Sequence, residues 1–489
     1  MNFRLIANIL GYIMLVEAGF MLFPLAVALY YGEGTWTAFL YSACICAAAG
    51  WLSLRVPLKR RRMHRREGYL AVAAAWLVLG LLGALPYIFT DAIPNYIDAL
   101  FETISGLTTT GSTILTEIEH LPRSVLFWRS LTQWMGGMGV LVLFLALMPK
   151  LGAGAVFLMR AESPGPIKSK LVPKVGETAK ILYGIYTGLT VLEIIALRLA
   201  GMRWFDAINH AFTTLATGGF SVKNTSIAAY SASPAILWII TVFTFLAGVN
   251  FSLVFWIVRG HIKDVLRNSE LRLYTAVIAA ATLLISLNLC IQSGLPLGES
   301  VGGAAFQVVT IMTTTGYATK DFALWPAFSQ TILVILMFAG GCAGSTAGGF
   351  KISRIQILVK SLRRDLQRIS HPNHVSVITV DGQMVEEHVV ASAQAYTVAY
   401  LLILLSGTLV VSWDNLGFTE SFVAALTCLS NVGPGLGLLG PMANFAGLSL
   451  FSKAVLSLLM LLGRLEIMPI LMLMNPGSWK DRYKKSSGH

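Results

Sequence analysis

The stretch LTTTGSTIL at residues 107–115 interrupts a chain that is otherwise strongly apolar, and it nearly returns as MTTTGYATK at residues 312–320. Each stretch sets three threonines directly before a glycine. Non-helical backbone survives at membrane depth only where protein buries it or where it borders water. What these two stretches form therefore depends on the segments around them.

The composition is that of a membrane protein. Of 489 residues, 55% are hydrophobic and 12% are charged, and the mean hydropathy is +0.70. Soluble proteins carry roughly a quarter charged residues. Apolar runs of about 20 residues, the length that spans a bilayer, recur along the chain. The first run, at residues 5–31, is too long for a signal-peptide core and predicts a retained helix.

The net charge of +12 would suit a nucleic-acid partner, but its distribution argues against one. The basic residues gather in breaks between apolar blocks, at 55–66, 150–180, 259–272, 351–368 and 480–485. By the positive-inside rule these breaks face the cytoplasm. We therefore expect lipid rather than nucleic acid around the chain, with both termini cytoplasmic.

The polar stretches belong to a fourfold repeat. They are ISGLTTTGS, FTTLATGGFS, VTIMTTTGYA and LTCLSNVGPG. The downstream match of GFSVKN with GYATKD sets Gly219 opposite Gly316, and the full set is Gly111, Gly219, Gly316 and Gly433. Repeats at this spacing indicate repeated structural units.

A segment of about a dozen residues precedes each glycine and is too short to span a bilayer. These segments lie at 97–108, 205–216, 297–312 and 418–429. Each has an acidic residue near its start, as a helix N-terminus favours. We expect four half-helices whose C-terminal ends point at the glycine stretches.

The expected fold is an all-α polytopic membrane protein with four units of helix, half-helix, loop and helix around one pore. The predicted segments are two N-terminal helices (1–60), repeat 1 (68–150), repeat 2 (178–260), repeat 3 with a broken inner helix (272–360), a cytoplasmic loop (361–391), repeat 4 (392–476) and a basic cytoplasmic tail (477–489). The loop contains Asp381-Gly382 between alternating residues, which indicates a hairpin. This hairpin is either a loop decoration or a docking surface for a partner.

Four glycine stretches around one axis would supply backbone carbonyls that replace the hydration shell of a cation. Glycine permits the φ angles that point such carbonyls inward. The residues expected to contact the ion are Thr110, Gly111, Gly218, Gly219, Thr315, Gly316, Val432 and Gly433. Each stretch keeps the first glycine of the Thr-Val-Gly-Tyr-Gly filter of tetrameric potassium channels, but Ser, Phe, Tyr or Pro follows it, which predicts looser discrimination. The alternative is a set of glycine turns that merely pack helices together.

The inner helix of the third repeat reads VILMFAGGCAGSTAGGFKISR. Interior glycines cost a helix about 1 kcal/mol each, so we expect this helix to break and to leave a gating loop across the pore. The gate residues are Gly340, Gly341, Gly344, Ser345, Thr346, Gly348 and Gly349. The alternative is a small-residue helix-packing face.

Arg464 lies within the apolar run LLMLLGRLEIMPILML. An ionisable side chain there is costly and suggests a function. We expect Arg464 to face the pore as part of the gate, and the alternative is a side chain that extends to the membrane surface. Glu466, two positions on, faces elsewhere on a helix and is a poor partner.

The fourfold repeat and the stretches TTTGS, TGGFS, TTTGYATKDF and SNVGPG resemble the Trk/Ktr/HKT potassium transporter superfamily over essentially the whole chain. The two N-terminal helices and the glycine-rich third unit are most similar to its bacterial TrkH-type branch. The resemblance implies potassium uptake across the bacterial inner membrane, a homodimer with one pore per subunit, and a cytoplasmic nucleotide-binding partner of the TrkA type. It also implies that residues 340–349 match the family's gate. A serine in place of the first filter glycine is associated with sodium permeation in this family, and this chain has Gly111.

A sodium-coupled or weakly selective cation transporter remains an alternative. A membrane enzyme is not expected, because the eight histidines form no His-x-x-x-His motif and the chain has no GxxxxGK[ST] phosphate loop. We expect potassium as the transported ion and no organic cofactor on this chain.

Overall fold

The structure, a computed structural model, describes residues 2–57, 65–139, 175–371, 377–467 and 470. The predicted basic tail (477–489), the end of repeat 1 and much of the basic stretches at 55–66 and 150–180 lie outside the described residues. Within them the chain is mostly helical. Six helices of the described part of the chain are long and apolar enough to cross a membrane, and a bent pair makes a seventh candidate. The chain is a multi-pass membrane protein, as the sequence predicts.

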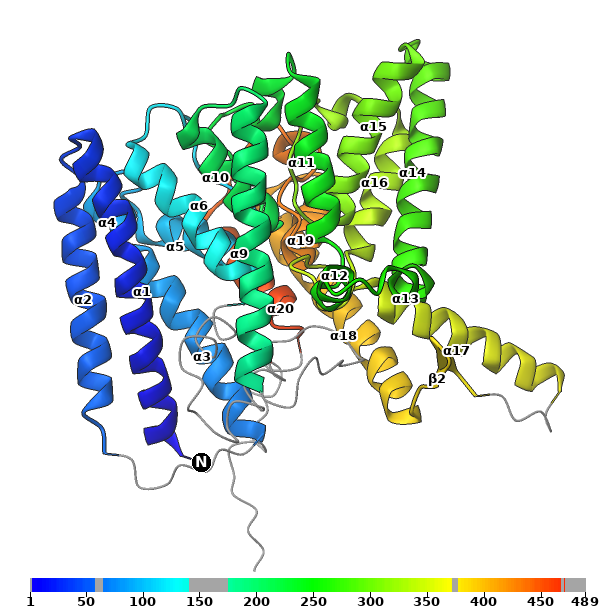
Figure 1. The fold of residues 1–489 in the computed structure, drawn as a ribbon, viewed down its shortest axis with the longest axis horizontal. Coiled ribbons are helices and arrows are strands. Elements are labelled where there is room, and N and C mark those ends of the chain that lie inside the picture. The colour runs from blue at the N-terminus through cyan, green and yellow to red at the C-terminus, as the bar shows by residue number, and fades with distance from the viewer. Residues whose placement is uncertain (1, 58–64, 140–174, 372–376, 468–469, 471–489) are drawn as a thin grey trace, which may run out of the picture.

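The first two helices pack side by side at one edge of the molecule (Figure 1). Helix α1 spans Phe3–Tyr31, starts with a cap from the Asn2 side chain and ends at Gly32, whose φ is 68°. Helix α2 spans Trp36–Leu54. The two helices cross at Gly11 and Gly50, where a Cβ on either would lie 2.8 Å from the carbonyl oxygen of the other. Only glycine permits this approach.

Four similar units follow, each with a long helix, a half-helix, a loop and an inner helix. The first has α3 (Arg65–Gly83), α4 (Leu85–Phe89), α5 (Tyr96–Leu107) and α6 (Arg123–Gly137). The second has α9 (Val175–Leu199), α10 (Trp204–Leu215), η2 (Ser226–Tyr230), α11 (Pro234–Ala247), α12 (Phe251–Val258) and α13 (Ile262–Arg267). The third has α14 (Ser269–Ser293), α15 (Leu297–Met312), η3 (Phe322–Leu324), α16 (Ala327–Ala339) and α17 (Ile352–Ser370). The fourth has α18 (Glu387–Val411), η4 (Ser412–Asp414), α19 (Phe418–Ser430), η5 (Gly437–Leu439) and α20 (Leu450–Arg464).

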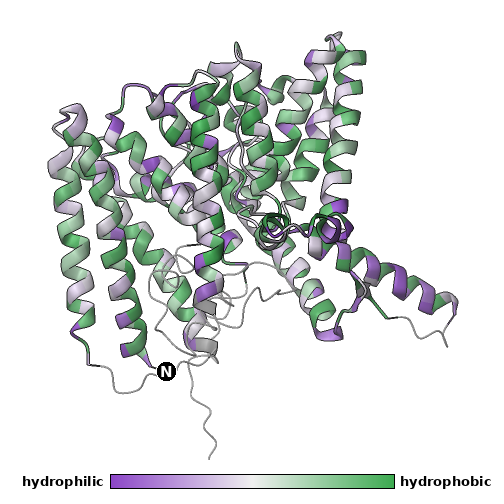
Figure 2. Cartoon of the chain, in the orientation of Figure 1, coloured by the Kyte–Doolittle hydropathy of each residue, from purple (hydrophilic) through white to green (hydrophobic). Residues whose placement is uncertain are grey.

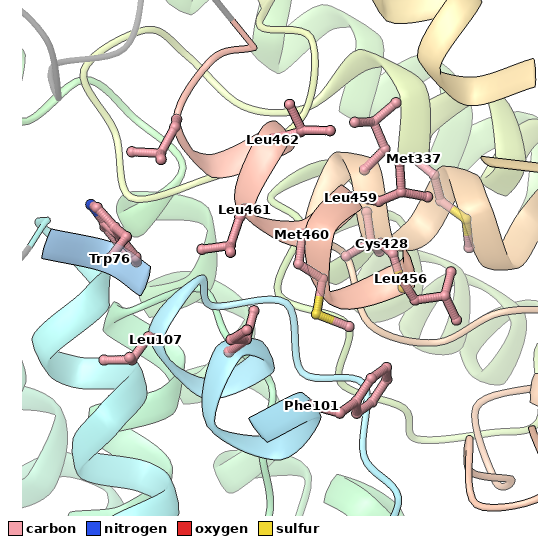
Figure 3. Close-up of a cluster of buried hydrophobic side chains, with 14 of the residues drawn as sticks. Trp76, Phe101, Leu107, Met337, Cys428, Leu456, Leu459, Met460, Leu461 and Leu462 are labelled. Atoms are coloured by element: carbon pink, nitrogen blue, oxygen red, sulfur yellow. The ribbon is translucent and has the colours of Figure 1, made fainter. Parts of the chain in front are cut away.

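The half-helices α5, α10, α15 and α19 each carry their acidic residue in the first turn, as expected. Helix α20 contacts both α5 and α19. Figure 3 shows the apolar contact: Leu461 and Met460 of α20 lie over Leu107 and Phe101 of α5, and all four side chains are buried. The fourth unit therefore packs against the first, so the four units form a closed arrangement.

Hydropathy follows this arrangement. Figure 2 shows mainly hydrophobic residues along the outer helices and a concentration of hydrophilic ones on α17, which projects from the bundle. Beside α17, strands β1 (Thr379–Val380) and β2 (Gln383–Met384) pair antiparallel around the Asp381-Gly382 turn.

Three boundaries differ from the sequence-based expectations. The inner helix of the second unit is not continuous, because α11 and α12 meet at 104°. Helix α17 continues to Ser370, so it enters the segment expected as loop from residue 361. Helix α20 ends at Arg464, and Glu466 and Ile467 have positive φ angles. Arg464 therefore lies at a helix terminus and not within a continuous helix.

Candidate functional site

The four half-helices end in the same way. The second residue before each ring glycine has a left-handed φ of 54–57°; these residues are Thr109, Thr217, Thr314 and Asn431. The amide after each of them bonds to a carbonyl five residues back, as in Thr110 N to Ser105 O (2.9 Å) and Thr315 N to Thr310 O (2.7 Å). This is the Schellman pattern of helix C-termini, which usually needs glycine at the left-handed position. Here three threonines and one asparagine adopt the left-handed conformation, which indicates that the surrounding structure strongly constrains them.

The four glycines come together in a closed ring. All have positive φ angles, of 85°, 74°, 76° and 110° for Gly111, Gly219, Gly316 and Gly433. A Cβ on any of them would lie 2.6 Å or less from a carbonyl oxygen of the next unit; these oxygens belong, in the same order, to Gly218, Thr315, Val432 and Thr110. The contacts run from unit 1 to 2, 2 to 3, 3 to 4 and 4 back to 1.

This ring brings together all eight residues expected to contact the ion. Its backbone carbonyl oxygens lie so close to the four glycines that none of these glycines could carry a side chain. The hydroxyl groups of Thr110 and Thr315 lie 2.8 and 2.9 Å from those of Thr108 and Thr313, and Thr110 also accepts a bond from the Asn431 amide at 3.0 Å. Neutral oxygens at close quarters can replace the water around a monovalent cation.

A buried ion pair supports the first loop from behind. Arg129 Nε lies 2.8 Å from Glu102 Oε1, and both residues are at most 1% exposed. Glu102 also accepts bonds from the Thr113 hydroxyl and the Ile114 amide, each at 3.0 Å. Arg129 Nη1 reaches into the second unit and donates to Ser221 O at 3.1 Å. The two charges are thus paired, and their hydrogen bonds connect the first and second loops to α6.

A second network joins the loops of units 2 and 3. The Tyr317 hydroxyl donates to His210 O at 3.1 Å and contacts the hydroxyl of Thr213. His210 is fully buried, and its Nε2 lies 3.0 Å from Ser221 Oγ. These side chains fill the space between α10 and the third loop.

The helix of unit 3 breaks where the sequence predicts. Helix α16 ends at Ala339 and α17 begins at Ile352, and the intervening loop is largely buried. Hydrogen bonds from Lys351 N to Ala339 O (2.9 Å) and from Ile352 N to Gly341 O (3.1 Å) hold its two ends together. The loop contains all seven expected gate residues other than Arg464.

The loop docks on the break in the neighbouring unit, which the sequence analysis missed. Cys342 N donates to Gly248 O and Gly344 O accepts from Phe251 N, both at 3.0 Å. The Thr346 hydroxyl donates to Ala247 O at 3.1 Å. From the start of α14, Glu270 accepts a bond from Ala343 N at 2.7 Å. The signal was present in the Gly248–Asn250 stretch, since asparagine is a favoured helix N-cap and Asn250 caps α12.

Arg464 contacts the same loop. Its Nη1 donates to Thr346 O at 2.8 Å, and its Nη2 contacts the carbonyls of Gly136 and Gly137 at the end of α6. Nearby, Glu466 pairs with Arg354 of α17 at 2.7 Å. Arg464 therefore joins the loop, the fourth inner helix and the first one.

Comparisons with known proteins find one family along almost the whole chain. The family model of TrkH, described as a cation transport protein, matches residues 36–480. The Trk system potassium uptake protein TrkH of Escherichia coli (strain K12) is 39% identical over 491 residues, which cover 98% of this chain and 100% of the relative. The Trk system potassium uptake protein TrkG of the same strain is 32% identical and is covered to 99%.

A solved structure is similar over the same extent. The crystal structure of the potassium transporter TrkH from Vibrio parahaemolyticus superposes with a TM-score of 0.88 at 35% identity, covering 98% of this chain and 100% of that one. Together with the family match, this shows that the chain belongs to the TrkH family of cation transport proteins.

Proposed function

We propose that this chain takes up potassium across the bacterial inner membrane through one pore, with the four-glycine ring as its selectivity filter. The observation that carries the proposal is the closed circuit of glycine–carbonyl contacts through all four units. Carbonyl oxygens held at fixed positions suit a large, weakly hydrated monovalent cation. The relatives' names point to the same ion, since they are potassium uptake proteins.

The buried loop at residues 340–351 is the proposed gate, with Arg464 as its brace. It lies against the filter, because Gly348 N donates to the Thr314 hydroxyl at 2.7 Å. Its movement would require breaking the bonds to Gly248, Glu270 and Arg464. We propose that a cytoplasmic nucleotide-binding subunit of the TrkA type supplies the energy for this change.

The chain is further proposed to work as a homodimer with cytoplasmic termini, each subunit conducting through its own pore. The second candidate function is sodium-coupled or weakly selective cation transport. It is favoured by the ring itself, because the four ring glycines are followed by unlike residues, Ser112, Phe220, Tyr317 and Pro434.

Expression in a bacterial strain that lacks its own potassium uptake systems tests the proposal. We expect growth at limiting potassium, and absence of rescue by a well-expressed, membrane-inserted protein would contradict it. Uptake into vesicles with potassium and sodium gradients set independently separates the two candidates. Coupled transport requires that a sodium gradient alone drive potassium accumulation.

A further inference from the structure

Gly218 is the exception among the residues that precede the ring glycines. The matching positions hold Thr110, Thr315 and Val432, which all have branched side chains. The φ angle of Gly218 is not positive, in contrast to that of Gly219. The backbone at this position therefore does not require glycine, and the reason for it must lie in the surroundings.

The side-chain amide of Gln133 occupies the space beside Gly218. A Cβ added to Gly218 would lie 2.4 Å from Gln133 Cδ, 2.6 Å from its Oε1 and 2.8 Å from its Nε2, which is too close for a side chain while the amide stays in place. Gln133 is fully buried and belongs to α6, the inner helix of the preceding unit. Its amide thus lies where the other three units have a side chain of their own.

The amide also brackets the ring glycine with two hydrogen bonds. Gln133 Nε2 donates to Gly218 O at 2.7 Å, and Phe220 N donates to Gln133 Oε1 at 3.1 Å. Gly219 lies between these two points. Because the Gly218 carbonyl has two lone pairs, one can bond to the amide while the other remains for an ion.

The second loop needs this support more than the first and third loops do. In the first and third loops, the ring threonine is held by a hydroxyl two residues earlier, from Thr108 and Thr313. The matching residue in the second loop is Ala216, which has no hydroxyl group. Two adjacent glycines without side-chain support would leave this quarter of the ring free to shift.

We propose that Gln133 is a specificity-determining positioning residue, which completes the second filter loop from the neighbouring unit and holds the Gly218 carbonyl at the distance that suits potassium. This inference rests on the proposed filter function. A ring that can contract around a smaller ion discriminates less against it. Gln133 prevents that contraction in the second loop, where Ala216 supplies no hydroxyl group to do so.

Gln133→Met is the first test, since it keeps the length of the side chain but removes both hydrogen bonds. We expect the ratio of potassium to sodium uptake into vesicles to fall about fivefold, the factor that one hydrogen bond of about 1 kcal/mol represents. A ratio within twofold of wild type would overturn the inference.

Gln307→Met is the matched comparison. Gln307 makes the same kind of bracket on the third loop, from Nε2 to Tyr317 O and from Thr319 N to Oε1, both at 3.3 Å. Its bonds lie beyond the ring glycine Gly316 and not on a ring carbonyl. We expect a smaller loss of discrimination than in Gln133→Met, and an equal loss would show general loosening and overturn the specific role.

A reciprocal exchange keeps the inference testable if Gln133→Met fails to fold. Gly218→Val alone introduces a clash with the amide and should impair uptake or folding. The double variant Gln133→Ala with Gly218→Val should recover uptake and discriminate better than Gln133→Ala alone. If Gly218→Val is tolerated with Gln133 in place, or if the double variant is no better than Gln133→Ala, the inference is wrong.

Gly316→Ser, measured in the same vesicles, distinguishes a failure of this inference from a failure of the proposed filter function. If Gly316→Ser lowers the ratio of potassium to sodium uptake and Gln133→Met does not, the proposed filter is retained and the proposed role of Gln133 is wrong. If neither variant changes the ratio, the ring is not the filter and both proposals fall.

Discussion

The amide of Gly348 lies 2.7 Å from the hydroxyl oxygen of Thr314 and donates a hydrogen bond to it. Thr314 lies two residues after the end of the third half-helix and two residues before the ring glycine Gly316. The buried loop of the third unit is therefore attached directly to the loop that carries Gly316. Under the gate and filter roles that we propose, movement of the loop would change the contacts of the ring, and conduction and discrimination would share this point of contact.

Thr314→Val should loosen the loop and raise potassium flux, because it removes the acceptor of the Gly348 amide while keeping the side-chain volume. One hydrogen bond of about 1 kcal/mol corresponds to about a fivefold change. Thr109→Val is the matched control, since Thr109 has the same φ region and its buried hydroxyl has no partner among the described residues. Flux into vesicles that rises equally in the two variants would contradict the attachment.

Deletion of residues 343–347 should raise flux further. The loop ends at Ala339 and Lys351 are bonded to each other at 2.9 Å, so shortening the tip leaves them in place. The deletion removes the Thr346 carbonyl that Arg464 holds. Flux is measured in vesicles without any partner subunit. Unchanged or lower flux in a folded deletion variant would favour a packing role for the glycines.

Arg464→Ala should increase potassium flux and leave ion preference nearly intact. Its positive charge opposes a cation in the pore; at ~8 Å and an effective dielectric constant near 20 the repulsion is roughly 2 kcal/mol, more than the 1.4 kcal/mol of a tenfold rate change. Arg464→Lys keeps the charge but loses the planar donor geometry that serves three carbonyls, so its flux should be intermediate. Arg464→Ala flux at or below wild type in a purified, folded protein would make Arg464 a structural anchor only.

Gly316→Ser should weaken discrimination between potassium and sodium. The new Cβ would overlap Val432 O, and a φ of 76° is unfavourable for serine. Gly302→Ser on the preceding half-helix is the control, because a Cβ there meets no atom within 4 Å. Relative uptake of the two ions that stays at the wild-type ratio in Gly316→Ser would show that the glycines are assigned in the wrong register.

Glu102→Gln should destabilise the protein, because it leaves the Arg129 guanidinium buried without its carboxylate. Breaking one partner of a buried pair costs about 3–5 kcal/mol. Thermal unfolding in detergent should shift clearly to lower temperature. Glu117→Gln is the surface control, with a side chain 74% exposed, and should change stability by no more than about 0.5 kcal/mol. Equal unfolding temperatures for the two variants would refute the supporting role.

The helical architecture could be predicted because apolar length and basic breaks are local signals. The break at residues 340–351 was also visible, since glycine density acts on the helix that contains it. The break between Ala247 and Phe251 was hidden in an apolar run, where one glycine and one asparagine carry the whole signal.

Other features depend on distant parts of the chain. Left-handed threonines at 109, 217 and 314 contradict residue preference and exist because the ring contacts enforce them. Arg464 was recognised by its cost in a membrane, but its position at the end of α20 follows from tertiary contacts. Gln133 carries no local signal, because its role comes from a loop 85 positions further along the chain.

Anomalous scattering from crystals grown in rubidium, a potassium substitute, tests the central claim most directly. The account predicts a rubidium peak on the axis enclosed by the carbonyl oxygens of Thr110, Gly218, Thr315 and Val432. The peak should weaken in crystals of the Gly316→Ser protein. Ordered rubidium elsewhere in the membrane region, with none inside this ring, would contradict the assignment of the four glycine loops as the filter.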